Sequence, residues 1–335
     1  MTRKINNSYT LGQSNAPTDG GDMLKTRGDG TLVWEGVADT TYVPVSWYGG
    51  RGVFGGGGTP SKSDVIQYIT INTTGNSTDF GNLTIIRNHV SGCSNGSRGV
   101  FEGGEGETVD NLDVIDYITI STIGNATDFG NLAQGKIGLG ACCDGTTGVW
   151  AGGQKSGDTQ VNDIDYITIS TTGNATDFGD LTGGSRVWAG GCSDGTKGVF
   201  GGGNSDASGN VNTIDYVTIA TTGNSLDFGN LTVGRSTTGC SSTTRGIFSS
   251  GGGDSNTIDY ITIATTGNAT DFGDMSVART RTSSCSNGSR GVFGGGITSS
   301  YQNTMDYITV ATTGNATDFG DLLTIAAVMG ACSGD

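Results

Sequence analysis

Aspartates recur at two fixed places along this sequence, and repeated carboxylates could coordinate calcium or serve as the acid and base of a glycosidase. A catalytic pair is needed only once, however, and the sequence contains no DxDxDG calcium-binding loop. We therefore predict that these aspartates are structural, capping turns and accepting hydrogen bonds from backbone N–H groups between strands. One set precedes tyrosines and the other precedes phenylalanines: Asp116, Asp165, Asp215, Asp259 and Asp306, then Asp79, Asp128, Asp177, Asp227, Asp271 and Asp318.

Basic residues recur at a third place, where a ring of cations could bind an anion. We expect instead that each cation pairs with a carboxylate of its own repeat or of a neighbouring repeat. The set is Arg87, Lys136, Arg186, Arg235 and Arg279.

Histidine and cysteine offer little metal chemistry. The single histidine, His89, cannot build a zinc or iron site, and we interpret it as a loop residue. Six of the seven cysteines fall at one place in the repeat, so we predict free, buried thiols that fill small apolar gaps. Cys143 is outside this pattern. From the histidine and cysteine content we expect that the protein holds no metal and no cofactor. The six are Cys93, Cys142, Cys192, Cys240, Cys285 and Cys332.

One acidic stretch occurs only once, as an enzyme site would. Glu102, Glu105, Glu107 and Asp110 are the local candidates for a polysaccharide lyase or glycosidase. Runs of like charge are usually solvated, so we expect no catalytic residues here and predict that the protein is not an enzyme.

Six copies of one segment organise the chain, and the copy at 258–275 reads IDYITIATTGNATDFGDM. A period in the forties, built from short β-rich runs and glycine turns, is typical of propeller blades. Within 279–322 the pattern predicts four antiparallel strands, with Asn287-Gly288 as the first hairpin turn. The repeated tyrosines lie 49, 49, 50, 44 and 47 residues apart: Tyr68, Tyr117, Tyr166, Tyr216, Tyr260 and Tyr307.

The order of residues within each blade resembles the kelch repeat. An arginine near the first strand is followed by a glycine pair ending the second, a tyrosine in the third and an aromatic residue in the fourth. The resemblance covers residues 48–335 and implies an all-β, six-bladed propeller like the central domain of galactose oxidase. The copper chemistry of that enzyme needs two histidine ligands. This chain has a single histidine and therefore cannot carry out that chemistry. The glycine pairs are Gly55-Gly56, Gly103-Gly104, Gly152-Gly153, Gly202-Gly203, Gly252-Gly253 and Gly295-Gly296.

The ends of the repeat region predict how the ring closes. The chain enters the repeat at a second strand, 49–57, and finishes with a lone first strand, 322–335, so we expect these two to pair in one blade. The connections between second and third strands differ in nearly every blade. We define the face that carries them, together with the 4–1 connections, as the variable face, and predict binding there. The candidate residues are Lys62, Glu105, Glu107, Asp110, Lys155, Asp158, Asp206 and Tyr301.

Residues 1–47 belong to no blade and hold one candidate hairpin, Met23–Leu24 with Thr31–Trp34, behind a polar arm. Too few apolar residues are present for a core, so we expect this arm to anchor the protein to a partner through Leu24, Leu32 and Trp34. The segment GDMLKTRGDGTLVWEG, at 21–36, resembles segments near the N-termini of tailed-bacteriophage fibre and appendage proteins. The blade sequences are similar to propeller proteins of aquatic phages.

Composition limits the environment and the partners. The net charge of −15 argues against nucleic-acid binding. No apolar run is long enough for a membrane span, and the N-terminus predicts no secretory signal. We therefore expect synthesis in a host cytoplasm, no membrane insertion and a final location in a virion.

Three functions stay open from the sequence. The first is a non-enzymatic phage virion protein, either a tail fibre or appendage or a head decoration, docked by its arm to other virion proteins and presenting the propeller to a host glycan or receptor. The alternatives are a kelch-type interaction module in a cell and a polysaccharide-degrading enzyme. Head or tail location and homo-oligomerisation are not decided by the sequence.

Overall fold

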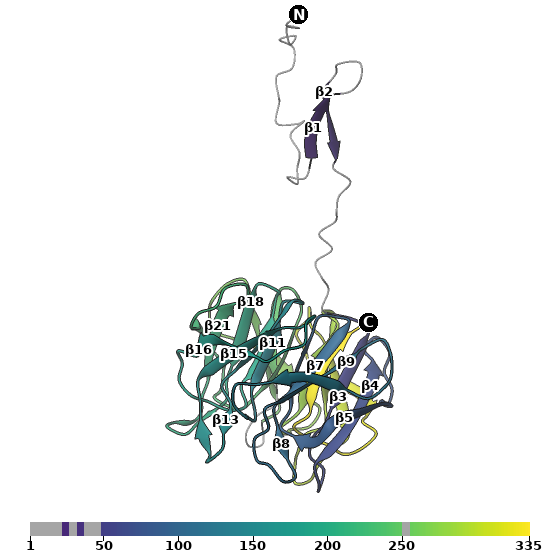
Figure 1. The fold of residues 1–335 in the computed structure, drawn as a ribbon, viewed down its shortest axis with the longest axis vertical. Helices are drawn as coiled ribbons and strands as arrows, with labels where there is room; N and C mark the ends of the chain where they lie inside the picture. The colour runs from purple at the N-terminus through teal and green to yellow at the C-terminus, as the bar shows by residue number, and fades with distance from the viewer. Residues whose placement is uncertain (1–21, 27–31, 37–47, 250–254) are drawn as a thin grey trace, which may run out of the picture. The chain divides into compact units, whose positions relative to one another are not determined.

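The computed structural model describes residues 22–26, 32–36, 48–249 and 255–335 (Figure 1). The chain divides into two units, Met1–Val45 and Ser46–Asp335. In the first unit β1 (Asp22–Thr26) and β2 (Leu32–Gly36) form an antiparallel hairpin in which Leu24 faces Trp34 in register. The hairpin agrees with the sequence prediction. Its turn, the polar arm before it and the glycine pair Gly252-Gly253 lie outside the described residues.

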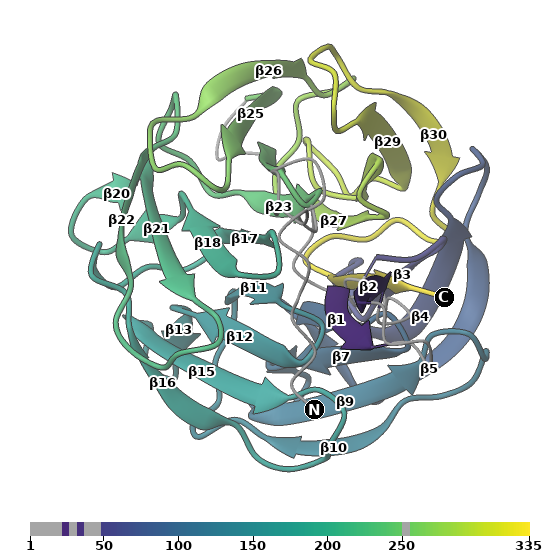
Figure 2. The ribbon, with the colours of Figure 1, turned by 90° about the horizontal axis from the view of Figure 1, so that it is seen from above.

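The second unit is a six-bladed β-propeller (Figure 2). Five blades are antiparallel sheets of four strands, and the sheet of blade 1 has a short fifth strand, β8 (Glu105–Gly106), at its edge. The described residues form strands and turns but no helix. The described residues thus contain no helix that is long and apolar enough to cross a membrane. The first three blades are β31 (Gly330–Gly334), β3 (Arg51–Gly55), β4 (Ser63–Thr70) and β5 (Thr78–Asn88); β6 (Ser91–Ser94), β7 (Arg98–Glu102), β9 (Val114–Thr119) and β10 (Thr127–Asn131); β11 (Gly140–Cys143), β12 (Thr147–Ala151), β15 (Asp163–Thr168) and β16 (Thr176–Asp180).

The remaining blades repeat this order. They are β17 (Gly190–Ser193), β18 (Lys197–Gly201), β21 (Thr213–Thr218) and β22 (Leu226–Asn230); β23 (Thr238–Ser241), β24 (Arg245–Ser249), β25 (Thr257–Thr262) and β26 (Thr270–Asp274); β27 (Ser283–Ser286), β28 (Arg290–Gly294), β29 (Thr304–Thr309) and β30 (Thr317–Asp321). Short extra strands lie in the 2–3 connections of blades 2, 3 and 4: β8 (Glu105–Gly106), β13 (Gln154–Lys155), β14 (Thr159–Gln160), β19 (Asn204–Ser205) and β20 (Gly209–Asn210).

The ring closes by pairing the two ends of the propeller in one sheet, as the sequence predicts. Strand β31 lies antiparallel to β3, with Arg51 opposite Gly334 and Gly55 opposite Gly330. The first strand of blade 1 therefore comes from the C-terminus and its other three strands come from the N-terminal side. This closure removes the free sheet edges at which blades could aggregate.

The core of each blade rests on three aromatic positions. The second-strand aromatic is fully buried in every blade, as at Phe54 and Trp150. The third-strand tyrosine meets the fourth-strand phenylalanine edge to face; the ring centroids of Tyr166 and Phe178 are 5.8 Å apart at 79°. Such a pair contributes about 0.5–1.5 kcal/mol beyond the burial of its area. It explains why both residues recur at a fixed spacing.

The repeated TGN turn joins each blade to the preceding one at the outer rim. The Asn125 side-chain oxygen accepts a hydrogen bond from the Asn82 N–H at 3.1 Å, and the Gly124 N–H donates to the Phe80 carbonyl at 2.8 Å. The fourth-strand glycine leaves room for this approach: at Gly273, where φ is +143°, a Cβ would lie 2.5 Å from the Gly314 carbonyl oxygen. The asparagines at this place thus hold blades together.

Candidate functional site

The recurring cations are buried structural partners and do not form an anion site. Each pairs with the aspartate before the tyrosine of the next blade, so the predicted pairing is confirmed. At the first junction Arg87 Nη2 lies 3.0 Å from Asp116 Oδ2, and both side chains are fully buried. Burial lowers the pKa of Arg87, while Asp116 opposes that shift. The other pairs are Lys136–Asp165, Arg186–Asp215, Arg235–Asp259 and Arg279–Asp306, with N···O distances of 2.7, 2.7, 2.9 and 3.0 Å.

The closure junction replaces both partners of this ion pair together. Ala326 stands at the place of the arginine and Gln67 at the place of the aspartate, and both are buried. The Gln67 Oε1 atom accepts hydrogen bonds from the Ser77 hydroxyl at 2.7 Å and the Leu323 N–H at 2.9 Å. The buried side chains of Gln67 and Ser77 are therefore neutral and hydrogen-bonded. Because both members of the ion pair are replaced together, no buried charge is left without a partner.

The two sets of aspartates have different environments. Asp116 accepts hydrogen bonds from the Thr84 N–H and hydroxyl, at 3.1 and 2.6 Å, in addition to its ion pair. The aspartates before the phenylalanines, such as Asp79, are exposed at the outer rim. Among the described residues no group of three or more His, Cys, Asp or Glu side chains is placed to hold a metal ion.

The predicted binding residues of the variable face do not come together in one site. Lys62 and Glu105, from blades 1 and 2, form an ion pair of 2.9 Å, and Tyr301 packs near Gly58. The interpretation of these connections as loops is wrong in part, since Glu105 lies in β8, which pairs with β5, and Lys155 lies in β13. The connection that holds β13 is long enough to form a hairpin with β14, whereas β8 adds to the edge of the preceding blade. The other predicted binding residues are exposed, and they are Glu107, Asp110, Asp158 and Asp206.

Glu102 is not part of the exposed acidic stretch. It ends β7 and is fully buried, at a place where other blades have glycine, alanine or serine. Neither of its carboxylate oxygens has a hydrogen-bond partner among the described residues. Burial raises the pKa of Glu102 well above its usual range, and Asp165 adds to the rise, while Lys136 and Arg87 oppose it. A carboxyl group enclosed in this way is inaccessible to a polysaccharide.

A cavity of about 440 Å³ lies at the axis of the propeller, where the 4–1 connections enter the first strands. We call it the channel mouth. It opens among the variable-face connections, since Asn210 and Ile297 from 2–3 connections also line it. Its rim is made by the residue two places before each first strand: His89, Gly138, Trp188, Ser236, Arg281 and Val328.

The backbone holds four of the non-glycine rim residues in an unusual conformation. The φ angles of His89, Trp188, Arg281 and Val328 are 55°, 61°, 58° and 53°, in the left-handed region that non-glycine residues seldom adopt. Hydrogen bonds from blade to blade impose it: the Trp188 N–H donates to the Gly138 carbonyl at 2.7 Å, and the Val328 N–H donates to the Arg281 carbonyl at 3.0 Å. Strain of this kind concentrates at functional sites.

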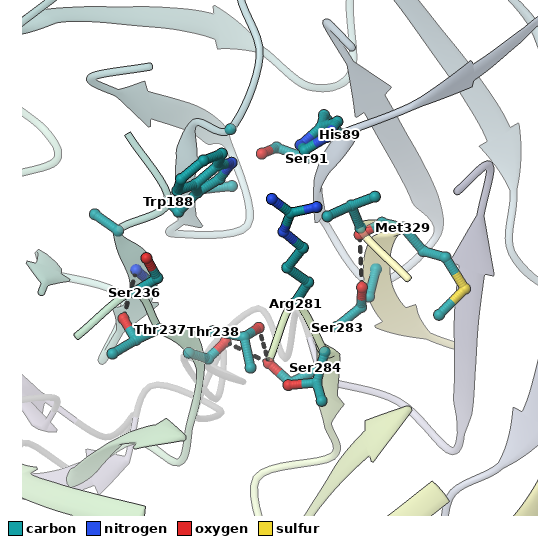
Figure 3. Close-up of a pocket in the computed structure, with 18 of the residues that line it drawn as sticks. His89, Ser91, Trp188, Ser236, Thr237, Thr238, Arg281, Ser283, Ser284 and Met329 are labelled. Atoms are coloured by element: carbon teal, nitrogen blue, oxygen red, sulfur yellow. Dashed lines mark hydrogen bonds between the residues drawn. The ribbon is translucent and has the colours of Figure 1, made fainter. Parts of the chain in front are cut away.

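The side chains of three rim residues, His89, Trp188 and Arg281, lie close together (Figure 3). The rings of His89 and Trp188 are stacked with centroids 6.2 Å apart, and the Arg281 guanidinium lies 5.3 Å from the indole centroid. Burial, reinforced by Arg281, lowers the pKa of His89 to about 4, so the imidazole is neutral at physiological pH. His89 Nδ1 and Trp188 Nε1 are buried without a hydrogen-bond partner among the described residues.

Sequence reasoning missed this cluster, because it treated His89 as an ordinary loop residue and did not consider Trp188 or Arg281. The three residues lie far apart in the chain but at the same phase of the repeat, which places them side by side around the axis. Aligning the blades on their first-strand cysteines would have shown that the three residues share one position of the repeat.

At the opposite end of the axial channel, hydrogen bonds join neighbouring first strands around a smaller cavity of about 80 Å³. Hydroxyls of the first strands donate to the preceding blade, as from Ser94 to the Ser333 carbonyl at 2.6 Å. Cys143 holds the equivalent place in blade 3, and its thiol interacts with the Ser94 backbone, which explains the one cysteine outside the pattern. The Tyr48 hydroxyl lies 3.2 Å from Ser241 Oγ at this end. The chain therefore enters the propeller on the side away from the channel mouth.

No protein-family model matches the sequence, and no curated protein matches it. The fold and the geometry of the channel mouth are therefore the evidence on which a function can be argued.

Proposed function

We propose that this protein is a non-enzymatic virion protein of a tailed bacteriophage, a tail fibre or appendage or a head decoration. In this proposal the N-terminal segment docks onto other virion proteins, and the variable face of the propeller attaches to the host surface. The resemblance of residues 21–36 to phage appendage segments, and of the blade sequences to propeller proteins of aquatic phages, supports this origin.

One observation carries the attachment role. The channel mouth opens on the variable face, whereas the chain enters the propeller at the other end of the axis, beside Tyr48. The point at which the chain enters the propeller therefore does not obstruct the mouth or the 2–3 connections. Strands β8 and β13, which belong to those connections, lie at the same end of the propeller (Figure 1).

The positions and partners of the charged residues support a role in binding without catalysis. The recurring arginines and the aspartates that precede the tyrosines are occupied in ion pairs between blades. Glu102 is enclosed, and Lys62 neutralises Glu105. The rim of the channel mouth carries no pair of carboxylates of the kind that glycosidases use.

The test mixes the full-length protein with candidate host cells and with their extracted surface polysaccharide, while cleavage is followed by the release of new sugar ends. We expect saturable binding without cleavage. Cleavage would favour the polysaccharide-degrading alternative. The absence of binding to any host cell, with capture of a cytosolic protein instead, would favour the kelch-type interaction module.

A matched pair of variants identifies the face that binds. Val109, in a 2–3 connection, and Ile123, in a 3–4 turn, belong to the same blade and are 53% and 61% exposed. Val109→Glu should weaken cell binding and Ile123→Glu should not, because only the first changes the variable face. The reverse result would contradict the proposed orientation. If deletion of residues 1–40 leaves incorporation into particles unchanged, the N-terminal segment is not the anchor.

A further inference from the structure

The channel mouth differs in charge from the rest of the molecule. The chain has 32 acidic residues and a net charge of −15, yet the residues that line the mouth include Arg281 and no aspartate or glutamate. The nearest charged groups that act on His89 besides Arg281 are Glu105 and Lys62, which are already paired with each other. The mouth is thus a local site for an anion within an acidic surface.

Arg281 is held ready for a ligand. Its side chain is exposed, and none of the ion pairs among the described residues includes it. Its guanidinium reaches toward the space between His89 and Trp188 (Figure 3), where the indole supports it from one side. A planar guanidinium in a fixed position is suited to two parallel hydrogen bonds with a carboxylate.

Four hydroxyls in the wall below the rim have protons that are already committed to carbonyl groups. The Ser91 hydroxyl donates to the Leu139 carbonyl at 2.6 Å, and the Ser283 hydroxyl donates to the Met329 carbonyl at 2.7 Å. Thr237 donates to the Gly201 carbonyl at 2.6 Å, and Ser284 donates to the Gly239 carbonyl at 2.9 Å. A hydroxyl used as a donor can still accept, so these four hydroxyls offer acceptor oxygens, and Thr237 already uses one lone pair to accept from the Gly190 N–H at 2.8 Å.

An acceptor-rich wall with a single cation distinguishes between anions. Phosphate and sulfate offer mainly acceptor oxygens, which Arg281, the Trp188 Nε1–H and the Thr282 hydroxyl can meet in part but the four committed hydroxyls cannot. A sugar acid provides a carboxylate for Arg281 and hydroxyl donors for the wall. Its ring also has an apolar face that can pack on an aromatic side chain such as Trp188.

We infer that the channel mouth binds one residue of an acidic sugar, a pyranose that carries a carboxylate. The cavity of about 440 Å³ lies within the range of about 300–1,000 Å³ typical of small-ligand sites. The inference deepens the proposed attachment function by naming the class of host glycan, and it rests on that function for its biological setting only. The binding site itself is tested without cells.

The experiment titrates the full-length protein with D-glucuronate, D-galacturonate, D-glucose and inorganic sulfate by calorimetry and ligand-observed NMR. We expect at least one of the two uronates to bind with a Kd of about 1 mM or tighter, and glucose and sulfate to bind at least about 10-fold more weakly. Equal binding of sulfate would overturn the sugar part of the inference, and equal binding of glucose would overturn the role of Arg281. Failure of both uronates to bind would overturn the whole inference.

Variants locate the site. Arg281→Asn removes the guanidinium while asparagine tolerates the left-handed backbone, so the fold should be retained, as a thermal melt will verify. It should weaken uronate binding at least about 10-fold, whereas Lys155→Gln, which removes a cation elsewhere on the variable face, should not. Trp188→Asn tests the aromatic support in the same way. Unchanged binding in Arg281→Asn would place the ligand elsewhere.

Binding to host cells, measured on the same preparations, separates the two proposals. Saturable binding to cells without uronate binding would overturn this inference and leave the attachment function standing. Uronate binding without binding to any host cell would support this inference and overturn the attachment function.

Discussion

The sulfur of Cys240 fills the space beside Gly291 in the next blade, where an added Cβ would lie only 2.7 Å from it. The same relationship joins the first-strand cysteine of every blade to a second-strand glycine of the blade that follows. A thiol is small enough to fill this gap without holding the blades apart. The paired cysteine and glycine therefore set the spacing of the innermost strands.

Gly291→Ala should lower the free energy of unfolding by about 1–3 kcal/mol, because the new methyl group overlaps the sulfur. Cys240→Ala alone should also destabilise, since it leaves a small cavity. The double variant should cost less than the sum of the two, as measured by chemical denaturation in a double-mutant cycle. Simple additivity would mean that the two side chains do not compete for this space.

The cysteines should be chemically silent while the protein is folded. All seven are free and buried, and burial raises the pKa of Cys240 to about 12 and that of Cys143 to about 11. Because the thiolate is the reactive form, a thiol reagent should label none of them rapidly at pH 8 in buffer and all of them in denaturant. Rapid labelling of one thiol in buffer would reveal local opening of its blade.

The ion pair between Arg235 and Asp259 should tolerate joint replacement better than single replacement. Asp259→Ala leaves a buried guanidinium without its carboxylate and should cost about 3–5 kcal/mol. The double variant Arg235→Ala with Asp259→Gln reproduces Ala326 and Gln67 of the closure junction and should cost less. A double variant as unstable as the single one would show that the closure junction depends on its own surroundings.

Glu102 should make stability fall as the pH rises. Its pKa is raised in the folded state, so the folded protein holds a proton that the unfolded chain releases above about pH 4.3. Relative to Glu102→Gln, the wild-type protein should lose roughly 1 kcal/mol per pH unit above that value until the folded-state pKa is reached. Denaturation curves recorded from pH 4 to pH 8 measure this difference. Parallel curves would mean that the carboxyl ionises freely in the folded protein.

His89 should have the opposite effect at lower pH. Its folded-state pKa of about 4 lies below the ordinary value of 6.5, so the unfolded chain takes up a proton first as the pH falls. The stability that neutral His89 contributes is complete above pH 6.5 and is lost between pH 6.5 and pH 4. His89→Asn, which suits the same backbone, should flatten this part of the profile. An identical profile in the variant would place the responsible group elsewhere.

The sequence by itself determined the six blades, the closure of the ring and the structural role of most charged residues. Each of these depends on a pattern that recurs in every blade, such as the spacing of Tyr166 and Phe178, and repetition makes a local signal strong. It also explained six cysteines through their common phase. The pairing of each recurring cation with an aspartate was expected from the sequence, but the structure decided that its partner always lies in the next blade.

Only the tertiary structure identified the channel mouth. At this position of the repeat, His89, Trp188 and Arg281 are each found in one blade only, so no recurring residue type connects them. Their left-handed backbone is one that their own residue types disfavour, and bonds such as that between Trp188 and Gly138 impose it. Residues of equal phase become neighbours only when the ring closes, because closure brings the start of every first strand to one axis.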